Sequence, residues 1–201
     1  MRYGMVFDLK RCIGCYACQM SCKAENATPP GIFWARVMEK EDGQHPLATR
    51  IFLPVLCNHC KDAPCVDICP TGASQKREDG IVFIDYDTCI GCRACMMACP
   101  YGSRFYWGKP KDTKYFPEEP TPYEQAGLER YQRGTVQKCD FCAHRLEKGL
   151  EPACIGGCPT KARYFGDLDD PTSEVSQLIR ERRGFQLQSE LGTDPSVYYI
   201  D

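Results

Sequence analysis

The chain has 201 residues, 26% charged and 43% hydrophobic, a balance typical of one or two folded domains rather than a disordered chain. Its net charge of -2 and sequence pI of about 6.0 argue against a nucleic-acid-binding surface. No stretch reaches the roughly 18 to 20 apolar residues that cross a bilayer, and Cys12 and Cys15 arrive before a secretory signal could form. Without its 16 cysteines the hydrophobic share is about 35%, so we expect an inorganic group to replace part of the core.

The cysteines form four quartets, which constitute an internal repeat. Lys23 follows the first quartet, whereas the other three end in Cys-Pro, where proline fixes φ and removes a backbone donor, so that the chain turns. In chain order the quartets are Cys12, Cys15, Cys18 and Cys22; Cys57, Cys60, Cys65 and Cys69; Cys89, Cys92, Cys95 and Cys99; and Cys139, Cys142, Cys154 and Cys158.

Three extended segments are expected to lead the chain into cysteine loops. They span residues 3–9, 50–55 and 81–85, and the last follows an Asp79-Gly80 turn signal. Each strand would therefore end where a quartet begins.

Residues 103–138, between the third and fourth quartets, are rich in proline and aromatic side chains. We expect an irregular insertion there, which either packs over a cluster or forms a docking surface. The residues that favour this interpretation are Pro110, Pro117, Pro120, Pro122, Tyr106, Trp107, Tyr115, Phe116 and Tyr123.

A C-terminal helix is expected after the last quartet. Asp170 can cap it with Pro171 at its first position, and an apolar stripe of Val175, Leu178 and Ile179 precedes Gly184. Residues 197–200 have extended propensity. The helix and tail could pack on this chain or on a partner.

Three chemistries could use sixteen cysteines: disulfides, zinc and iron-sulfur clusters. Disulfide frameworks belong mostly to small secreted chains, whereas these thiols recur three residues apart in C-x2-C units. Zinc would take four ligands tetrahedrally, usually from two knuckles separated by a longer loop. The run C-x2-C-x2-C-x3-C at Cys12 to Cys22 and Cys89 to Cys99 is instead the bacterial ferredoxin pattern.

In that pattern three close thiolates bind one cubane and the fourth binds a neighbouring cubane. The second and fourth quartets are loop-lengthened versions of the same run, with spacers of four and eleven residues. Sixteen cysteines therefore predict four 4Fe-4S clusters in two ferredoxin-like modules. His59 and His144 lie beside ligand cysteines, and we expect them to support the site rather than to bind iron.

Basic side chains near the ligands could offset the negative charge of the clusters. They are Lys10, Arg11, Lys23, Lys61, Arg93, Lys138, His144, Arg145 and Lys161, although ordinary solvated side chains are an equally simple explanation for about half of them.

With these quartets in place, the sequence resembles the iron-sulfur subunits of the molybdenum and tungsten bis-pterin oxidoreductases, the group of dimethyl sulfoxide, polysulfide, thiosulfate and arsenate reductases. Nitrate-reductase-type relatives carry Trp at the position of Cys92 and hold a three-iron centre, so Cys92 argues against that branch. The segments that carry the resemblance are Met5-Val6-Phe7-Asp8, Cys57-Asn58-His59-Cys60, Cys69-Pro70-Thr71-Gly72-Ala73, Cys99-Pro100-Tyr101-Gly102, Lys138-Cys139-Asp140-Phe141-Cys142 and Gly166-Asp167-Leu168.

The resemblance implies which cysteines share a cluster, because in that family the first quartet pairs with the fourth and the second with the third. It assigns cluster a to Cys12, Cys15, Cys18 and Cys158; cluster b to Cys139, Cys142, Cys154 and Cys22; cluster c to Cys57, Cys60, Cys65 and Cys99; and cluster d to Cys89, Cys92, Cys95 and Cys69.

The expected fold is α+β, with two pseudo-symmetric ferredoxin-like modules, an irregular insertion and a C-terminal helix and tail. Residues 1–56 and 103–165 would form the first module, 57–102 the second, and 166–201 the C-terminal element. All sixteen thiols are used as ligands, so no cysteine remains as a nucleophile and the chain is expected to be non-catalytic.

The resemblance further implies a role in anaerobic respiration, in which the chain relays electrons between a quinol or other donor and a large molybdopterin-containing catalytic subunit. A membrane quinone-reactive subunit is a further expected partner. The complex would be membrane-associated on the periplasmic side, by co-export with the catalytic subunit, or else cytoplasmic. The alternative function is a polyferredoxin-like adaptor of a hydrogenase or formate-linked complex.

Overall fold

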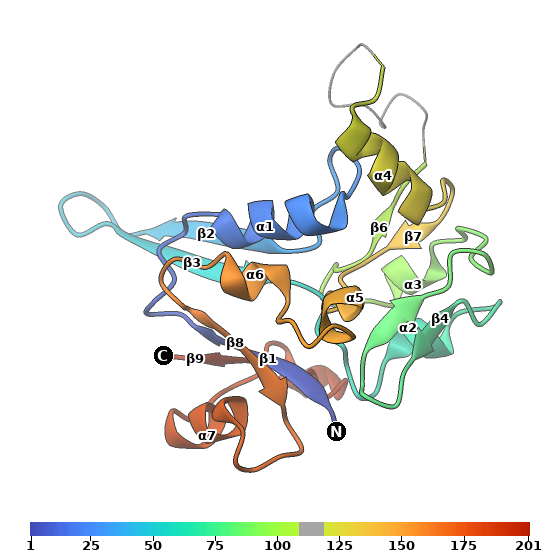
Figure 1. Ribbon diagram of the computed structural model, residues 1–201. Helices are drawn as coiled ribbons and strands as arrows, with labels where there is room; N and C mark the ends of the chain where they lie inside the picture. The colour runs from blue at the N-terminus through green and yellow to red at the C-terminus, as the bar shows by residue number, and fades with distance from the viewer. Residues whose placement is uncertain (109–118) are drawn as a thin grey trace.

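The computed structural model describes residues 1–108 and 119–201, which form small sheets connected by short helices (Figure 1). This mixed α/β architecture agrees with the expected class. The strands are β1 (Tyr3–Asp8), β2 (Arg36–Asp42), β3 (Thr49–Val55), β4 (Ser74–Lys76), β5 (Val82–Ile84), β6 (Phe105–Tyr106), β7 (Val136–Gln137), β8 (Arg163–Asp167) and β9 (Val197–Ile200). The helices are α1 (Ala17–Asn26), α2 (Pro64–Asp67), α3 (Ala94–Met97), α4 (Pro122–Arg130), α5 (Ala143–Leu146), α6 (Ala153–Gly156), α7 (Glu174–Glu181) and the 3₁₀ turn η2 (Ser189–Leu191).

The largest sheet joins the two ends of the chain in the order β8-β1-β9. Strand β1 pairs antiparallel with β8, Met5 facing Phe165, and parallel with β9, Met5 facing Val197. The side chain of Met5 is fully buried in this sheet. The three expected strands before the quartets are confirmed as β1, β3 and β5.

Helix α7 and strand β9 pack on this chain, which answers the question that the sequence left open. Val175 of α7 is fully buried, and the helix packs against β8, β1 and β9. The expected start of the helix is wrong, however. Ser173, rather than Asp170, caps α7 by accepting a hydrogen bond from the Ser176 backbone N-H, while Asp170 accepts one from Thr172 within the preceding turn.

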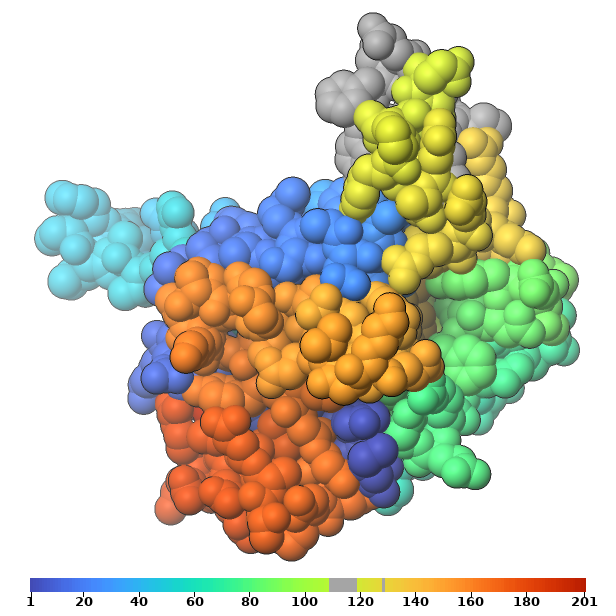
Figure 2. All heavy atoms as spheres, in the orientation of Figure 1, coloured from blue at the N-terminus to red at the C-terminus, as the bar shows by residue number. Residues whose placement is uncertain are grey.

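Strands β2 and β3 form a hairpin in which Arg36 faces Val55 and Asp42 faces Thr49. Its far end extends away from the rest of the chain (Figure 2), and Leu47 at that end is 82% exposed. The strands β4 and β5 form a second, smaller hairpin, and β6 pairs with β7.

The expectation of an irregular insertion at residues 103–138 is wrong in its described part. Helix α4 begins with a capping box, in which Thr121 and Glu124 hydrogen-bond each other's backbone N-H, and Pro122 occupies the first turn. The helix packs on the end of α1: Arg130 donates to the Glu25 carbonyl at 3.0 Å. Pro110, Tyr115, Phe116 and Pro117 lie outside the described residues.

Cysteines are built into the hydrophobic core. One cluster of buried side chains combines Met5, Phe7 and Trp34 with cysteines of the first, second and fourth quartets. A second cluster combines Val82, Ile84 and Val136 with Cys60, Cys65 and Cys95. The ligands proposed below therefore occupy positions that aliphatic side chains fill in an ordinary domain.

Candidate iron-sulfur centres

All four cysteine loops share one backbone feature. The residue before the second cysteine has a positive φ in each: Gly14 at 66°, His59 at 43°, Gly91 at 66° and Phe141 at 55°. Few residues other than glycine adopt a left-handed backbone, so its recurrence at one position marks a shared loop conformation. The four loops therefore turn alike, although their later spacers differ in length.

The short helices position the remaining thiols. Cys18, Cys65, Cys95 and Cys154 each lie in the first turn or two of α1, α2, α3 and α6 respectively. Helix α1 packs against α6, and α2 packs against α3 (Figure 1). The structure therefore brings the first quartet against the fourth and the second against the third.

In the α1 and α6 pair, Cys22 lies among cysteines of the fourth quartet. The side-chain amide of Asn26 lies 3.7 Å from the Sγ atoms of both Cys22 and Cys142, as a donor to each. Burial raises the pKa of Cys22 well above its usual range, and the neighbouring Cys154 and Cys142 raise it further. Burial likewise raises the pKa of Cys142 to about 12; a backbone hydrogen bond from Ala153 opposes the rise, and the charges of Asp140 and Cys154 add to it.

Cys158 has the converse surroundings. Burial raises the pKa of Cys18, and the charge of Arg163 lowers it. The nearby Cys154, Cys158 and Cys12 raise it further. The last cysteine of the fourth quartet thus lies beside thiols of the first quartet.

In the α2 and α3 pair, Cys99 lies within reach of the second quartet. Burial raises the pKa of the Cys60 thiol to about 12, a hydrogen bond with Thr193 opposes the rise, and the nearby Cys57, Cys65 and Cys99 add to it. Burial raises the pKa of Cys95, the charge of Arg104 and a hydrogen bond from it oppose the rise, and the nearby Cys89 and Cys69 add to it. All sixteen cysteines are described, and each is a free thiol rather than part of a disulfide.

Backbone donors are directed at several of these sulfurs. The N-H of Ser74 lies 3.4 Å from Cys69 Sγ, that of Ala162 lies 3.3 Å from Cys158 Sγ, and that of Phe141 lies 3.4 Å from Cys139 Sγ. Although burial opposes the effect, such hydrogen bonds hold the pKa of Cys69 below its usual range. N-H groups that favour a thiolate also favour the metal-bound form of the sulfur.

Two buried arginines, Arg104 and Arg163, also face the cysteines, and sequence reasoning missed both. Nη2 of Arg104 donates to Cys65 Sγ at 2.9 Å, while its Nε and Nη1 have no acceptor among the described residues. Both Nη atoms of Arg163 are also buried, and neither has a hydrogen-bond acceptor among the described residues. Buried donors next to sulfur fit a bound iron-sulfur cluster, whose sulfide and thiolate atoms are acceptors.

The two histidines beside cysteines have protein partners. His59 is 1% exposed, accepts at Nδ1 from the Val82 N-H at 3.0 Å and stacks on Phe141 with ring centroids 3.7 Å apart. Nε2 of His144 lies 2.8 Å from a Glu25 carboxylate oxygen. Lys138, one of the basic residues noted in the sequence, is buried and donates to the carbonyls of Val82 and Cys139.

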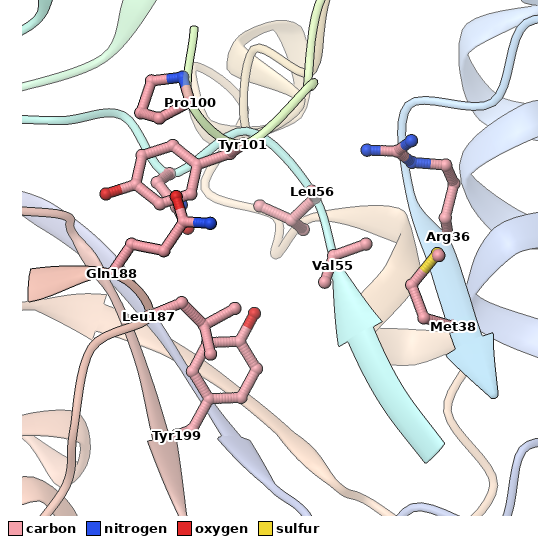
Figure 3. A pocket seen from close by; sticks show the side chains of 10 residues that line it. Arg36, Met38, Val55, Leu56, Pro100, Tyr101, Leu187, Gln188 and Tyr199 are labelled. Atoms are coloured by element: carbon pink, nitrogen blue, oxygen red, sulfur yellow. The ribbon is translucent and has the colours of Figure 1, made fainter. Parts of the chain in front are cut away.

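A pocket of about 220 Å³ opens beside the second and third quartets, between the residues that flank Cys57 and Cys99 (Figure 3). Tyr101 and Leu187 lie on one side of it, and Arg36 lies across from them. Typical small-molecule sites have roughly 300 to 1,000 Å³, so we assign no substrate to this pocket.

Comparisons with known proteins identify the family. A 4Fe-4S dicluster domain matches residues 48–115 and 111–168, and a 4Fe-4S binding domain matches residues 3–24. The chain is 46% identical to the putative iron-sulfur subunit of a dimethyl sulfoxide reductase from Halobacterium salinarum, over 99% of this chain and 79% of that one. It is 42% identical to the arsenate respiratory reductase iron-sulfur subunit of Shewanella sp., over 100% of this chain and 96% of that one.

The chain belongs to this family of reductase iron-sulfur subunits. A selenate reductase subunit of Mesobacillus selenatarsenatis is a further relative, 46% identical over 98% of this chain and 70% of that one. The iron-sulfur protein described here is accordingly an electron-transfer subunit, and its cofactors are 4Fe-4S clusters, four for sixteen cysteines. In the described parts of this protein, no helix is long and apolar enough to span a bilayer.

Proposed function

We propose that this protein passes electrons between a quinol or other donor and a catalytic subunit that holds a molybdenum or tungsten bis-pterin centre. Each cluster, when bound, accepts and releases one electron. The chain's own residues hold the clusters close together, exclude water from them and supply hydrogen bonds to their sulfurs. The reductase names of its relatives support a catalytic partner of this class.

The proposal includes the ligand sets. Cluster a takes Cys12, Cys15, Cys18 and Cys158; cluster b takes Cys139, Cys142, Cys154 and Cys22; cluster c takes Cys57, Cys60, Cys65 and Cys99; and cluster d takes Cys89, Cys92, Cys95 and Cys69. The observation that carries the exchange between the first and fourth quartets is the Asn26 amide, which lies at equal distances from Cys22 and Cys142. Two cysteines from the first and fourth quartets that share one hydrogen-bond donor support a ligand exchange between those quartets.

Two modules follow from these sets: residues 1–56 with 103–165, and residues 57–102, followed by a C-terminal element at 166–201. The packing of α1 on α6 and of α2 on α3 supports this division. Clusters held within one module would be near neighbours, so an electron would cross each module in a short step. A membrane-associated complex, exported together with the catalytic subunit, or a cytoplasmic complex would both accommodate this relay.

Replacement of Cys22 by Ser tests the ligand exchange. The iron signal that depends on Cys139, Cys142 and Cys154 should change, while the signal that depends on Cys12, Cys15 and Cys18 should persist. EPR spectra of the reduced variant, compared with those of Cys139→Ser and Cys12→Ser, provide the measurement. If the Cys22→Ser spectrum instead matches that of Cys12→Ser, the first quartet binds a cluster of its own and the proposed sets are wrong.

The partner requires a separate test. Co-purification of this protein with its large partner chain, followed by metal and pterin analysis of that chain, should yield molybdenum or tungsten with pterin. A large partner with neither metal would contradict the proposal and leave the electron-transfer role intact.

A further inference from the structure

Two arginines occupy equivalent positions after different quartets. Arg104 lies five residues after Cys99, and Arg163 lies five residues after Cys158. Both follow a Cys-Pro turn, and both side chains are almost completely buried, at 3% and 4% exposed. The same position after the second quartet holds Ser74, whose Oγ accepts from Arg104 Nη2 at 2.7 Å.

Neither guanidinium meets a carboxylate within residues 1–108 and 119–201. An arginine remains protonated when it is buried, and a buried charge needs an opposite charge close by. The Cζ atom of Arg163 lies over the Phe7 ring, 4.6 Å from its centroid. The ring covers the guanidinium but attracts its charge only weakly. The negative charge that stabilises both arginines must therefore come from the thiolates and from what they bind.

Each arginine faces thiols of two quartets. Nη2 of Arg104 donates to Cys65 Sγ at 2.9 Å. Burial lowers the pKa of Arg104, but the negative charges of Cys65, Cys57 and Cys95 raise it above its usual range. Burial likewise lowers the pKa of Arg163, whose two Nη atoms are both buried, and the negative charges of Cys154, Cys18 and Cys158 raise it above its usual range. With the ligand sets proposed above, Arg104 lies beside clusters c and d, and Arg163 lies beside clusters a and b.

We propose that Arg104 and Arg163 are internal counter-charges, one for each pair of clusters, that raise the reduction potentials of both clusters in the pair. The inference rests on the proposed ligand sets. Addition of an electron makes a cluster more negative, and a cation a few ångströms away in a medium of low dielectric constant favours that state. The same cation weakens the repulsion that one reduced cluster exerts on its neighbour. A counter-charge between the two clusters thus allows either of them to hold the electron.

Charge-removing variants of the full chain with its clusters assembled test this inference, with midpoint potentials measured by EPR-monitored redox titration. The Cys22→Ser and Cys69→Ser variants first assign the signals to pairs. In Arg104→Gln, both clusters of the second and third quartets should titrate at lower potential. We expect the ratio of reduced to oxidised cluster at the wild-type midpoint to fall at least tenfold, which corresponds to about 59 mV for one electron. Arg163→Gln should shift the other pair in the same way.

Arg93 offers a matched control. It follows the ligand Cys92 directly, but its side chain is exposed and lies over the Tyr106 ring at 3.7 Å. Arg93→Gln removes the same charge from a position where water screens it, so its midpoint potentials should stay within roughly threefold of the wild-type ratio.

Arg104→Lys separates charge from shape, since lysine keeps the charge but lacks the planar fork. With full iron content, the Arg104→Lys protein should keep midpoint potentials near those of the wild type. If Arg104→Gln loses iron, the midpoint potentials of Arg104→Lys test the inference instead. Unchanged midpoints in an iron-replete Arg104→Gln protein would overturn the inference, as would a Lys variant that loses iron or shifts tenfold. If Arg104→Gln instead lowers one midpoint in each pair, the counter-charge stands and the ligand sets are wrong.

Discussion

The position before the second cysteine of each loop needs a positive φ, and three residue types adopt it: Gly, His and Phe. Glycine occupies it in the first and third loops, where φ is 66° in both. In the second and fourth loops His59 and Phe141 adopt positive φ despite their side chains, and their rings stack at 3.7 Å. A left-handed conformation costs an ordinary residue roughly 1 to 2 kcal/mol, which the stacking of the two rings partly offsets.

Gly91→Ala should destabilise the third loop severely. A Cβ at Gly91 would lie 1.7 Å from the Gly134 carbonyl oxygen, in addition to the cost of φ +66°. Gly72→Ala is the matched control, because its φ is +69° with no atom within 4 Å of the new Cβ. We expect a loss of about 1 to 2 kcal/mol for the control and about 2 to 5 kcal/mol for Gly91→Ala, measured by thermal unfolding of the cluster-loaded protein. Equal losses for the two variants would show that the close approach to Gly134 carries no cost.

At this scale the sequence predicts the sixteen candidate ligands but not the groups that surround them. Asn26, Arg104 and Arg163 have no neighbouring cysteine within three residues to mark them. The sequence signal for these arginines is their shared position, five residues after the last cysteine of a quartet. Arginine occupies that position only after the third and fourth quartets. Their role depends on contacts between quartets, which a linear pattern does not contain.

At the scale of elements, the absence of proline after Cys22 has a structural reason. Lys23 lies inside α1, which continues to Asn26, and proline at that point would remove an intrahelical hydrogen bond. The buried ammonium group of Lys23 donates to the carbonyls of Thr28, Pro29 and Ile32. The prolines of residues 103–138 favour an irregular segment, although the Thr121 to Glu124 spacing is a capping-box signature that predicts the start of α4.

Helix α7 is joined to strand β1 by an ion pair between the partly exposed Arg182 and the buried Asp8. Nη1 of Arg182, the residue after α7, donates to Asp8 Oδ2 at 2.5 Å, and Asp8 is 2% exposed. Burial by itself would raise the pKa of Asp8, but hydrogen bonds from Arg182 and from backbone N-H groups hold it below its usual range. The stabilisation is therefore present at neutral pH and is lost as the pH falls through that lowered pKa.

Arg182→Gln should lower the free energy of unfolding by about 1.5 to 3 kcal/mol at pH 7, because the Asp8 carboxylate would remain buried without its cation. The double variant with Asp8→Asn should lose less than the sum of the two single variants, as measured by urea unfolding. Strict additivity of the two losses would mean that Asp8 and Arg182 contribute independently.

At the scale of the whole molecule, the β8-β1-β9 sheet joins strands that are distant in sequence. The sequence predicted the strands before the quartets and the extended tail, yet the parallel pairing of β9 with β1 could not be read from local pattern. The register depends on which side chains are buried together. Met5, near one end of the chain, and Val197 and Ile200, near the other, are all fully buried in this sheet.

Removal of the clusters should unfold most of the chain. Cysteines fill core positions beside Phe7, Trp34 and Phe141, and without bound clusters their thiols leave a small apolar core around empty space. The free energy of binding in such domains is largely free energy of folding. After acid or chelator treatment under reducing conditions, far-UV circular dichroism should lose most of its helix and strand signal. A cluster-free chain with a sharp cooperative thermal transition would contradict this expectation.

The central claim is that sixteen thiolates hold four complete cubanes. Iron and acid-labile sulfide, measured on anaerobically purified protein together with zinc, test it most directly. We expect about sixteen iron and sixteen sulfide atoms per chain, with zinc far below one equivalent. Stoichiometric zinc without sulfide would contradict the account.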